Sequence, residues 1–85
     1  MAKNARVGDK LSHGGAIISG SQNVLTNGIP QARLGDLAVC ALHGVVSIVT
    51  GSSNVYVNGK PLARLGDLCS CGASITSGSF NTETN

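Results

Sequence analysis

The sequence contains few of the residues that usually anchor a core or bind nucleic acid. It has no tryptophan, one tyrosine, one phenylalanine, and six Lys or Arg against four Asp or Glu, which gives a net charge of +2. Without a basic run or aromatic side chains for base stacking, we expect no nucleic-acid partner. No apolar run is long enough to span a membrane. The remaining composition, rich in Val, Ile, Leu, Ala and 12 Gly, favours short strands and tight turns over helices.

The length of the chain, 85 residues, predicts one small domain. Residues 1–6 lead into no apolar segment of the kind found in signal peptides, so we expect synthesis in the cytoplasm without a signal peptide. A domain this small buries a limited fraction of its surface and is often stabilised by a metal or a partner. Three cysteines are an odd number, and in a reducing compartment they favour metal ligation over a disulfide framework.

Two short motifs alternate along the chain, and each occurs three times. Ala-Arg-x-Gly-Asp begins at Ala5, Ala32 and Ala63, and Gly-Ser-x-Asn begins at Gly20, Gly51 and Gly78. A repeat of this kind constrains the architecture more than any single residue does. Because the Arg and the Asp stand three residues apart each time, we predict that they share a structural role in a turn.

The spacing of the motifs predicts a closed object of three units. The step from Ala-Arg to the next Gly-Ser is 15 residues in the first and third units and 19 in the second, whereas the return step is 12 residues both times. The second unit therefore carries four extra residues, which fall between Cys40 and Gly51. The third unit stops after residues 78–81, and the N-terminal segment supplies the piece that it lacks. We therefore expect the two chain ends to meet in space.

Each unit is predicted to be β-structure. Residues 45–49 are apolar and β-branched, and residues 54–57 lead into Asn58-Gly59, as the first unit leads into Asn27-Gly28. Asn-Gly is a strong hairpin signal because a type I′ turn needs positive φ at both central positions. Pro30 and Pro61 cannot donate a ladder hydrogen bond, which places the return segments at an edge. The alternative is an ordinary β-meander with duplicated hairpins, and the third Ala-Arg-x-Gly-Asp argues against it.

A possible metal ligand stands four residues after each repeated Asp: His13, Cys40 or Cys71. A structural zinc site needs four nitrogen or sulfur ligands. The only insertion contains His43, which completes the pair Cys40-x-x-His43. We therefore predict that His13, Cys40, His43 and Cys71 converge where the three units meet and bind one Zn²⁺, with iron as the main competitor.

The third cysteine, Cys69, has the apolar counterparts Leu11 and Ala38 in the other units. We therefore interpret it as a small buried residue. The spacing Cys69-x-Cys71 leaves open the reverse assignment, in which Cys69 is the ligand.

A catalytic interpretation pairs Cys40 as nucleophile with His43 as base. No Asn or Asp is singled out to orient the histidine, and short hairpins leave little room for a substrate pocket. Four candidate ligands indicate a closed zinc site, because a catalytic zinc keeps one position open. We therefore predict that the protein is not an enzyme and has no small-molecule substrate.

Taken together, the motifs resemble those of the PAAR-repeat family. The resemblance covers essentially the whole chain and rests on His13-Gly14-Gly15, Gly-Ser-x-Asn-Val, Asn-Gly-x-Pro-x-Ala-Arg-x-Gly-Asp and Cys71-Gly72. Where the family's name spells Pro-Ala-Ala-Arg, this chain has Pro-Gln-Ala-Arg at residues 30–33 and Pro-Leu-Ala-Arg at residues 61–64. His13 and Cys71 match positions of the family pattern, whereas Cys40 and His43 fall in a linking segment where that pattern is looser.

The resemblance implies an all-β fold, a small pseudo-threefold cone of short strands and hairpins with zinc or iron near its tip. It also implies that the base docks on a trimeric β-helical spike, one chain per trimer, and that the tip makes transient contact with a target membrane. The spike would be a VgrG-like protein of a type VI secretion system or part of a contractile phage tail, delivered outward on firing. Residues 1–85 would be a single PAAR-like domain with no effector extension and a short polar tail at residues 82–85.

Two other functions fit the same residues. The alternative to a spike tip is a small zinc-binding adaptor unrelated to injection machines, which would use the metal to present loops to another protein. A Cys-dependent hydrolase is the third possibility. Metal content, capture by a trimeric spike and the effect of replacing Cys40 distinguish the three.

Overall fold

The computed structural model describes residues 2–79 and 81–84, and within them the chain forms nine short strands and no helix. The strands are β1 (Ala2–Lys3), β2 (Gly15–Ile17), β3 (Leu25–Thr26), β4 (Ile29–Pro30), β5 (Leu37–Cys40), β6 (Gly44–Ser47), β7 (Tyr56–Val57), β8 (Lys60–Pro61) and β9 (Glu83–Thr84). The predicted all-β fold class is confirmed. Met1, Phe80 and Asn85, which belong to the predicted N-terminal segment, the third Gly-Ser-x-Asn and the tail, lie outside the described residues.

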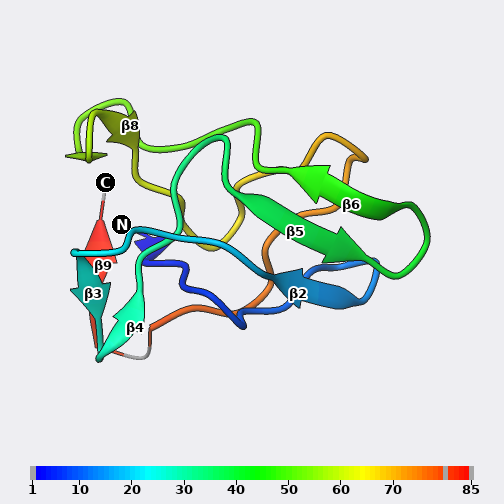
Figure 1. Cartoon of the computed structure of the whole chain (residues 1–85), viewed down its shortest axis with the longest axis horizontal. Helices are drawn as coiled ribbons and strands as arrows, with labels where there is room; N and C mark the ends of the chain where they lie inside the picture. The colour runs from blue at the N-terminus through cyan, green and yellow to red at the C-terminus, as the bar shows by residue number, and fades with distance from the viewer. Residues whose placement is uncertain (1, 80, 85) are drawn as a thin grey trace.

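Three equivalent hairpins lie at one end of the molecule, at the left in Figure 1. β3 pairs with β4 around Asn27-Gly28, and β7 pairs with β8 around Asn58-Gly59. Asn27 and Asn58 have φ of 56° and 54°, and the glycines that follow have 76° and 78°. Both central residues are therefore left-handed, as a type I′ turn requires, and the predicted Asn-Gly hairpins are confirmed.

The third hairpin is made by the two ends of the chain. β1 pairs with β9, with Lys3 opposite Glu83, in the same antiparallel register that places Leu25 opposite Pro30. The expectation that the termini meet is confirmed, and Figure 1 shows both ends on this side of the molecule. The expected polar tail at residues 82–85 is wrong in one respect, because Glu83–Thr84 is a paired strand and completes the third unit.

A ring of backbone hydrogen bonds marks the pseudo-threefold axis. Ala5 N–H donates to the carbonyl oxygen of Ala63 at 3.1 Å, Ala32 N–H to that of Ala5 at 3.0 Å, and Ala63 N–H to that of Ala32 at 3.0 Å. All three alanines are fully buried. A cycle in which each unit donates to the next closes only when the three units surround a common axis. An ordinary β-meander does not produce it.

The repeated Arg and Asp form the same turn in each unit. Arg Nε lies 3.1, 2.8 and 3.1 Å from the Asp carboxylate in the pairs Arg6–Asp9, Arg33–Asp36 and Arg64–Asp67. The same carboxylate accepts the backbone N–H of its own Arg at 2.7 to 2.8 Å. The carboxylate thus closes the turn at both backbone and side chain, and the predicted structural role is confirmed.

The core lies between the hairpin end and the opposite end and repeats the same threefold pattern. Ile17, Ile48 and Ile75 are each about 1% exposed, and each N–H donates to the carbonyl oxygen of its unit's repeated Asp at 2.9 Å. Each Ile also pairs with the next unit, in the bridges Ile75–Leu11, Ile17–Ala38 and Ile48–Cys69. Cys69 therefore occupies a core position together with Leu11 and Ala38, as its apolar counterparts predict.

The four extra residues of the second unit lengthen one hairpin. β5 and β6 pair with Cys40 opposite Gly44, and β2 adds to the other edge of β5 with Gly15 opposite Cys40. This three-stranded sheet reaches the right-hand end in Figure 1, away from the chain termini. Gly15 has φ of 92°, and a Cβ on it would lie 1.8 Å from the carbonyl oxygen of Val39. Only glycine therefore allows β2 to approach β5 at this point.

Candidate metal centre

Four side chains that could hold a metal converge at the end opposite the three hairpins. His13 lies in the turn before β2, Cys40 is the last residue of β5, His43 lies in the turn between β5 and β6, and Cys71 lies in the turn after Cys69. One ligand atom from each residue lies within 4.8 Å of all the others. These are the four predicted residues, and the structure brings them together from all three units. Metal ligation itself remains a prediction.

Tight turns orient the ligands. Gly14 N–H donates to Leu11 O at 3.0 Å, and Gly72 N–H donates to Cys69 O at 2.9 Å. Both glycines have positive φ, 84° and 89°, so the chain reverses directly after His13 and after Cys71. This explains why a glycine follows the ligand in both units. In the second unit, the N–H of His43 donates to Cys40 O at 3.2 Å and closes the β5–β6 turn.

The spacing of the donor atoms suits tetrahedral coordination. Cys40 Sγ lies 3.6 Å from Nδ1 of His13 and 3.4 Å from Nδ1 of His43. A tetrahedral zinc with ordinary Zn–S and Zn–N bonds holds a sulfur and a nitrogen donor about 3.6 Å apart. The two imidazole rings lie 5.6 Å apart, centroid to centroid, and are tilted by 44°. The rings do not stack, so two nitrogens can face one centre from different directions.

The electrostatics of the site favour a thiolate at Cys40, which is 1% exposed. Burial raises the pKa of Cys40, but hydrogen bonds with His43, the Leu42 backbone, His13 and Cys71 outweigh it and lower the pKa to about 6. A thiolate is the form of cysteine that binds metal.

The donor set also indicates which metals fit. No Asp, Glu, Lys or Arg occurs in residues 11–32, 37–59 or 68–82, the stretches that contain the four ligands. Carboxylate ligands are therefore not available nearby, and calcium or magnesium would lack their preferred oxygens. Two thiolates and two neutral imidazoles suit zinc or iron and balance the charge of a divalent ion.

The other cysteine of the pair at residues 69 and 71 is not part of this group. Cys69 is 2% exposed and packs in the core. Burial raises the pKa of the Cys69 thiol, and the nearby thiols of Cys71 and Cys40 raise it further. Because Cys71 and not Cys69 belongs to the group of four close ligand atoms, the structure favours Cys71 over the reverse assignment as the fourth ligand.

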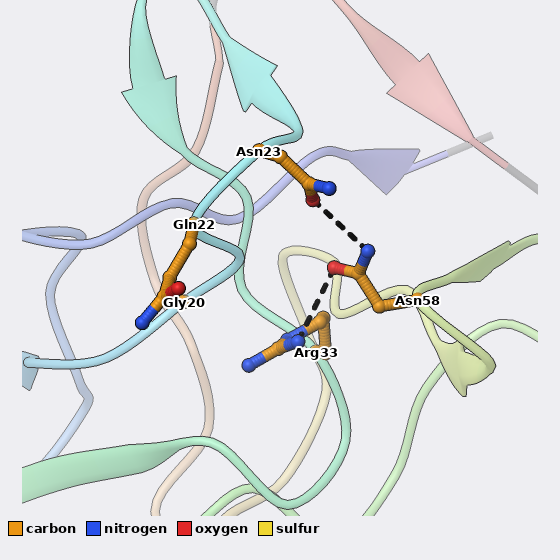
Figure 2. Close-up of a pocket in the computed structure, with 5 residues that line it drawn as sticks. All are labelled: Gly20, Gln22, Asn23, Arg33 and Asn58. Carbon is orange, nitrogen blue, oxygen red and sulfur yellow. Dashed lines mark hydrogen bonds between the residues drawn. The ribbon is translucent and has the colours of Figure 1, made fainter.

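A polar pocket lies near the hairpin end and was not predicted from the sequence (Figure 2). It is lined by Gly20, Gln22, Asn23, Arg33 and Asn58. Asn58 Nδ2 donates to Asn23 Oδ1 at 3.0 Å, and Arg33 NH1 donates to Asn58 Oδ1 at 3.3 Å. The lining contains no nucleophile–base pair, and its side chains join the Asn-Gly turn of one unit to the Gly-Ser-x-Asn segment of another. The repetition of both motifs was the available signal for this network.

The pseudo-threefold closure and the four-ligand group together define the class of the protein. It is a small all-β repeat protein with one candidate metal centre at the end opposite the three hairpins. A family model described as the PAAR motif matches residues 7–77 of the 85-residue chain. The chain therefore belongs to the PAAR family, and its membership supports a structural role at the spike tip of a type VI secretion system or phage. A comparison with curated proteins found no match. Within the described residues, no helix could cross a membrane.

Proposed function

We propose that this protein is a metal-stabilised tip that caps a trimeric β-helical spike, one chain per trimer. The observation that carries the proposal is the closed ring of Ala5, Ala32 and Ala63, since it makes a single chain threefold in its backbone. A partner with a true threefold axis can then meet equivalent elements in all three directions. Such a contact of one chain with three terminates the assembly, because no second cap can add to it.

The hairpin end is the surface that we assign to the spike. At one repeat position, Leu25 and Tyr56 are 57% and 59% exposed, and beside them Val24 and Val55 are also exposed. Their equivalents in the third unit are Thr82 and Glu83. Exposed apolar side chains on two of the three units at one end support a protein interface there.

The opposite end is the point that would meet a target membrane. Leu42 and Val45 are 71% and 64% exposed, and they flank His43 on the β5–β6 hairpin. The whole segment from residue 37 to residue 59 carries no formal charge. An uncharged apolar point has no ionic group to desolvate when it enters a bilayer.

The metal that we propose is zinc, held by His13, Cys40, His43 and Cys71 in a closed structural site, with iron as the competitor. When bound, it would neutralise two thiolates and cross-link three units that otherwise share a small core. Binding of a structural zinc adds to folding free energy, on the order of 10 kcal/mol in zinc-dependent peptides.

Metal analysis of the purified protein tests the site. We expect about one zinc or iron per chain, as for a single closed four-ligand site. Cys40→Ser should lose the metal, whereas Cys69→Ala should retain it, because its equivalent in the second unit is already Ala38. A Cys69→Ala variant that loses metal while Cys40→Ser keeps it would overturn the assignment.

Capture by a spike trimer tests the partner. The protein should co-purify with a trimeric β-helical spike protein at one chain per trimer, measured by native mass spectrometry. Leu25→Asp and Tyr56→Asp should weaken capture at least about 10-fold, and the matched control Leu42→Asp at the other end should leave it unchanged. Equal loss in all three variants would refute the assignment of the hairpin end. A metal-loaded protein that no spike captures would instead favour the zinc-binding adaptor.

A further inference from the structure

The candidate metal centre contains two thiols that are close enough to form a disulfide instead of binding a metal. Cys40 Sγ and Cys71 Sγ belong to the group whose ligand atoms all lie within 4.8 Å of one another. A disulfide needs a sulfur–sulfur distance of about 2.05 Å, so a shift of less than about 3 Å joins them. Cys71 lies in a turn and Cys40 ends a strand, and neither lies in the interior of a regular element.

We propose that Cys40 and Cys71 are an oxidative modification site whose co-substrate is a low-molecular-weight disulfide. In the metal-free protein they would form a disulfide that replaces the metal as the link between the second and third units. The bond and the metal are mutually exclusive, because both use the same two sulfurs. The competition between disulfide and metal rests on the metal site proposed above, whereas formation of the disulfide itself does not.

Burial sets the order of the reaction. Cys71 is partly exposed, whereas Cys40 is 1% exposed. The Cys71 thiolate therefore attacks a sulfur of the small disulfide first, forming a mixed disulfide and releasing one small thiolate. The Cys40 thiolate then attacks Cys71 Sγ and releases the second small thiolate. The protein loses two electrons, the small disulfide is reduced to two thiols, and the two cysteine protons pass to these products.

The third cysteine provides an internal comparison. Cys69 is as buried as Cys40, and both belong to the core cluster, but Cys69 is not in the ligand group. In an unfolded chain, however, neither Cys40 nor Cys69 is held beside Cys71, so links among all three cysteines would compete. Selection of Cys40 over Cys69 is thus a property of the fold that an unfolded chain would not reproduce.

The chemistry fits a protein that moves between compartments. In a reducing compartment the thiols stay free and the metal can load, whereas an oxidising compartment supplies small disulfides and protein oxidants. A tip that lost its metal outside would remain closed by the Cys40–Cys71 bond. The bond would close a loop of roughly 30 residues, a length for which disulfides stabilise appreciably.

The test uses the full chain, stripped of metal by a chelator, kept at low temperature and checked for native circular dichroism. After incubation with oxidised glutathione, we expect the intact mass to fall by about 2 Da, and one of the three thiols to remain. Non-reducing peptide mapping should find Cys40 joined to Cys71. The same treatment in urea should give a mixture of links among the three cysteines. Zinc-loaded protein should react at least about 10-fold more slowly.

Variants separate the steps. Cys40→Ser should stop at a glutathione adduct on Cys71, Cys71→Ser should give neither the adduct nor the link, and Cys69→Ala should still form the Cys40–Cys71 bond. A native Cys69–Cys71 link, or a wild-type protein that keeps three free thiols, would overturn the proposal, and wild-type mapping alone decides this if a variant fails to fold. Equal rates with and without zinc would refute only the proposed metal protection.

Discussion

Gln31 is predicted to be the most sensitive buried polar residue of the fold. Its side chain lies across the pseudo-threefold axis, where Nε2 donates to the carbonyl oxygens of Ala5, Ala32 and Ala63 at 2.7, 2.8 and 3.3 Å. Its Oε1 accepts the hydroxyl hydrogen bond of Thr26 at 2.6 Å. One fully buried amide therefore contacts all three units.

The cost of Gln31→Ala can be worked from these contacts. Each alanine carbonyl keeps the hydrogen bond of the ring, so the loss there is about 1 kcal/mol for each well-formed contact to Nε2. The Thr26 hydroxyl becomes buried without this partner, which costs about 1–3 kcal/mol more. A further cost comes from the cavity. We expect a loss of at least about 3 kcal/mol, which lowers the Tm of a domain this size by roughly 12 °C or more.

Urea and thermal unfolding of metal-saturated protein measure this loss. Gln22→Ala is the matched control, since it removes the same side chain from an exposed position and should change stability by less than about 0.5 kcal/mol. Gln31→Leu copies Leu62 at the equivalent position. Adding Thr26→Val to it should raise the free energy of unfolding, because the second change removes the hydroxyl that Gln31→Leu leaves without its partner. If Gln31→Ala were no more destabilising than Gln22→Ala, the axial role would be wrong.

Three further predictions concern the backbone, the repeated ion pairs and the metal. Gly15→Ala should destabilise the protein far more than Gly8→Ala in the same unfolding assay. Both glycines have φ near 92°, but of the two only Gly15 would place the added Cβ onto a carbonyl oxygen, that of Val39. Equal effects would contradict the close approach of β2 to β5. Burial opposes ionisation of Asp36, but hydrogen bonds, chiefly from Arg33, hold its pKa below the usual value. Ionised Asp36 therefore contributes to the free energy of unfolding above about pH 4, and this contribution is lost as the pH falls further. The difference in free energy of unfolding between wild type and Asp36→Asn should narrow on acidification, and a constant difference would refute the linkage. Chelation should lower Tm by roughly 10 °C or more and should expose the β5–β6 amides to hydrogen exchange before those of the three hairpins; an unchanged Tm after proven metal loss would exclude a stabilising metal.

The sequence was sufficient to predict the elements that repeat. Asn27-Gly28 and Asn58-Gly59 predicted their turns because positive φ at two successive positions is costly for most other residues. The three Ala-Arg-x-Gly-Asp motifs predicted three units because of their repetition. A single Arg–Asp pair can be an ordinary surface ion pair, whereas three copies at related spacing indicate a shared structural role. The group of His13, Cys40, His43 and Cys71 followed from equivalence plus the single insertion.

The sequence was not sufficient where the three units differ at one repeat position. Asn4, Gln31 and Leu62 are equivalent and all buried, but Leu62 has no polar side-chain group, whereas the Gln31 amide donates to carbonyl oxygens of all three units. A side chain at the axis contacts all three units, so its role depends on packing among the units and not on any one repeat. Strand lengths were also overestimated, because residues 45–49 and 54–57 contribute only β6 and β7. After β6, Ile48 leaves the β5 pairing and forms a single bridge with Cys69 of the next unit, and β7 begins only at Tyr56.

The distribution of symmetry along the molecule explains why the insertion lies where it does. Three equivalent units can supply three equivalent ligands, but a closed zinc site needs four, so a symmetric trimer of such units would leave one coordination position unfilled. A single chain can break the symmetry once, and this chain does so in the β5–β6 hairpin, which brings His43 beside Cys40. The Ala5–Ala32–Ala63 ring and the three hairpins lie away from that insertion and keep their threefold pairing. Fusing three units into one chain therefore allows a fourth ligand at one end without disturbing the threefold end that we assign to the spike.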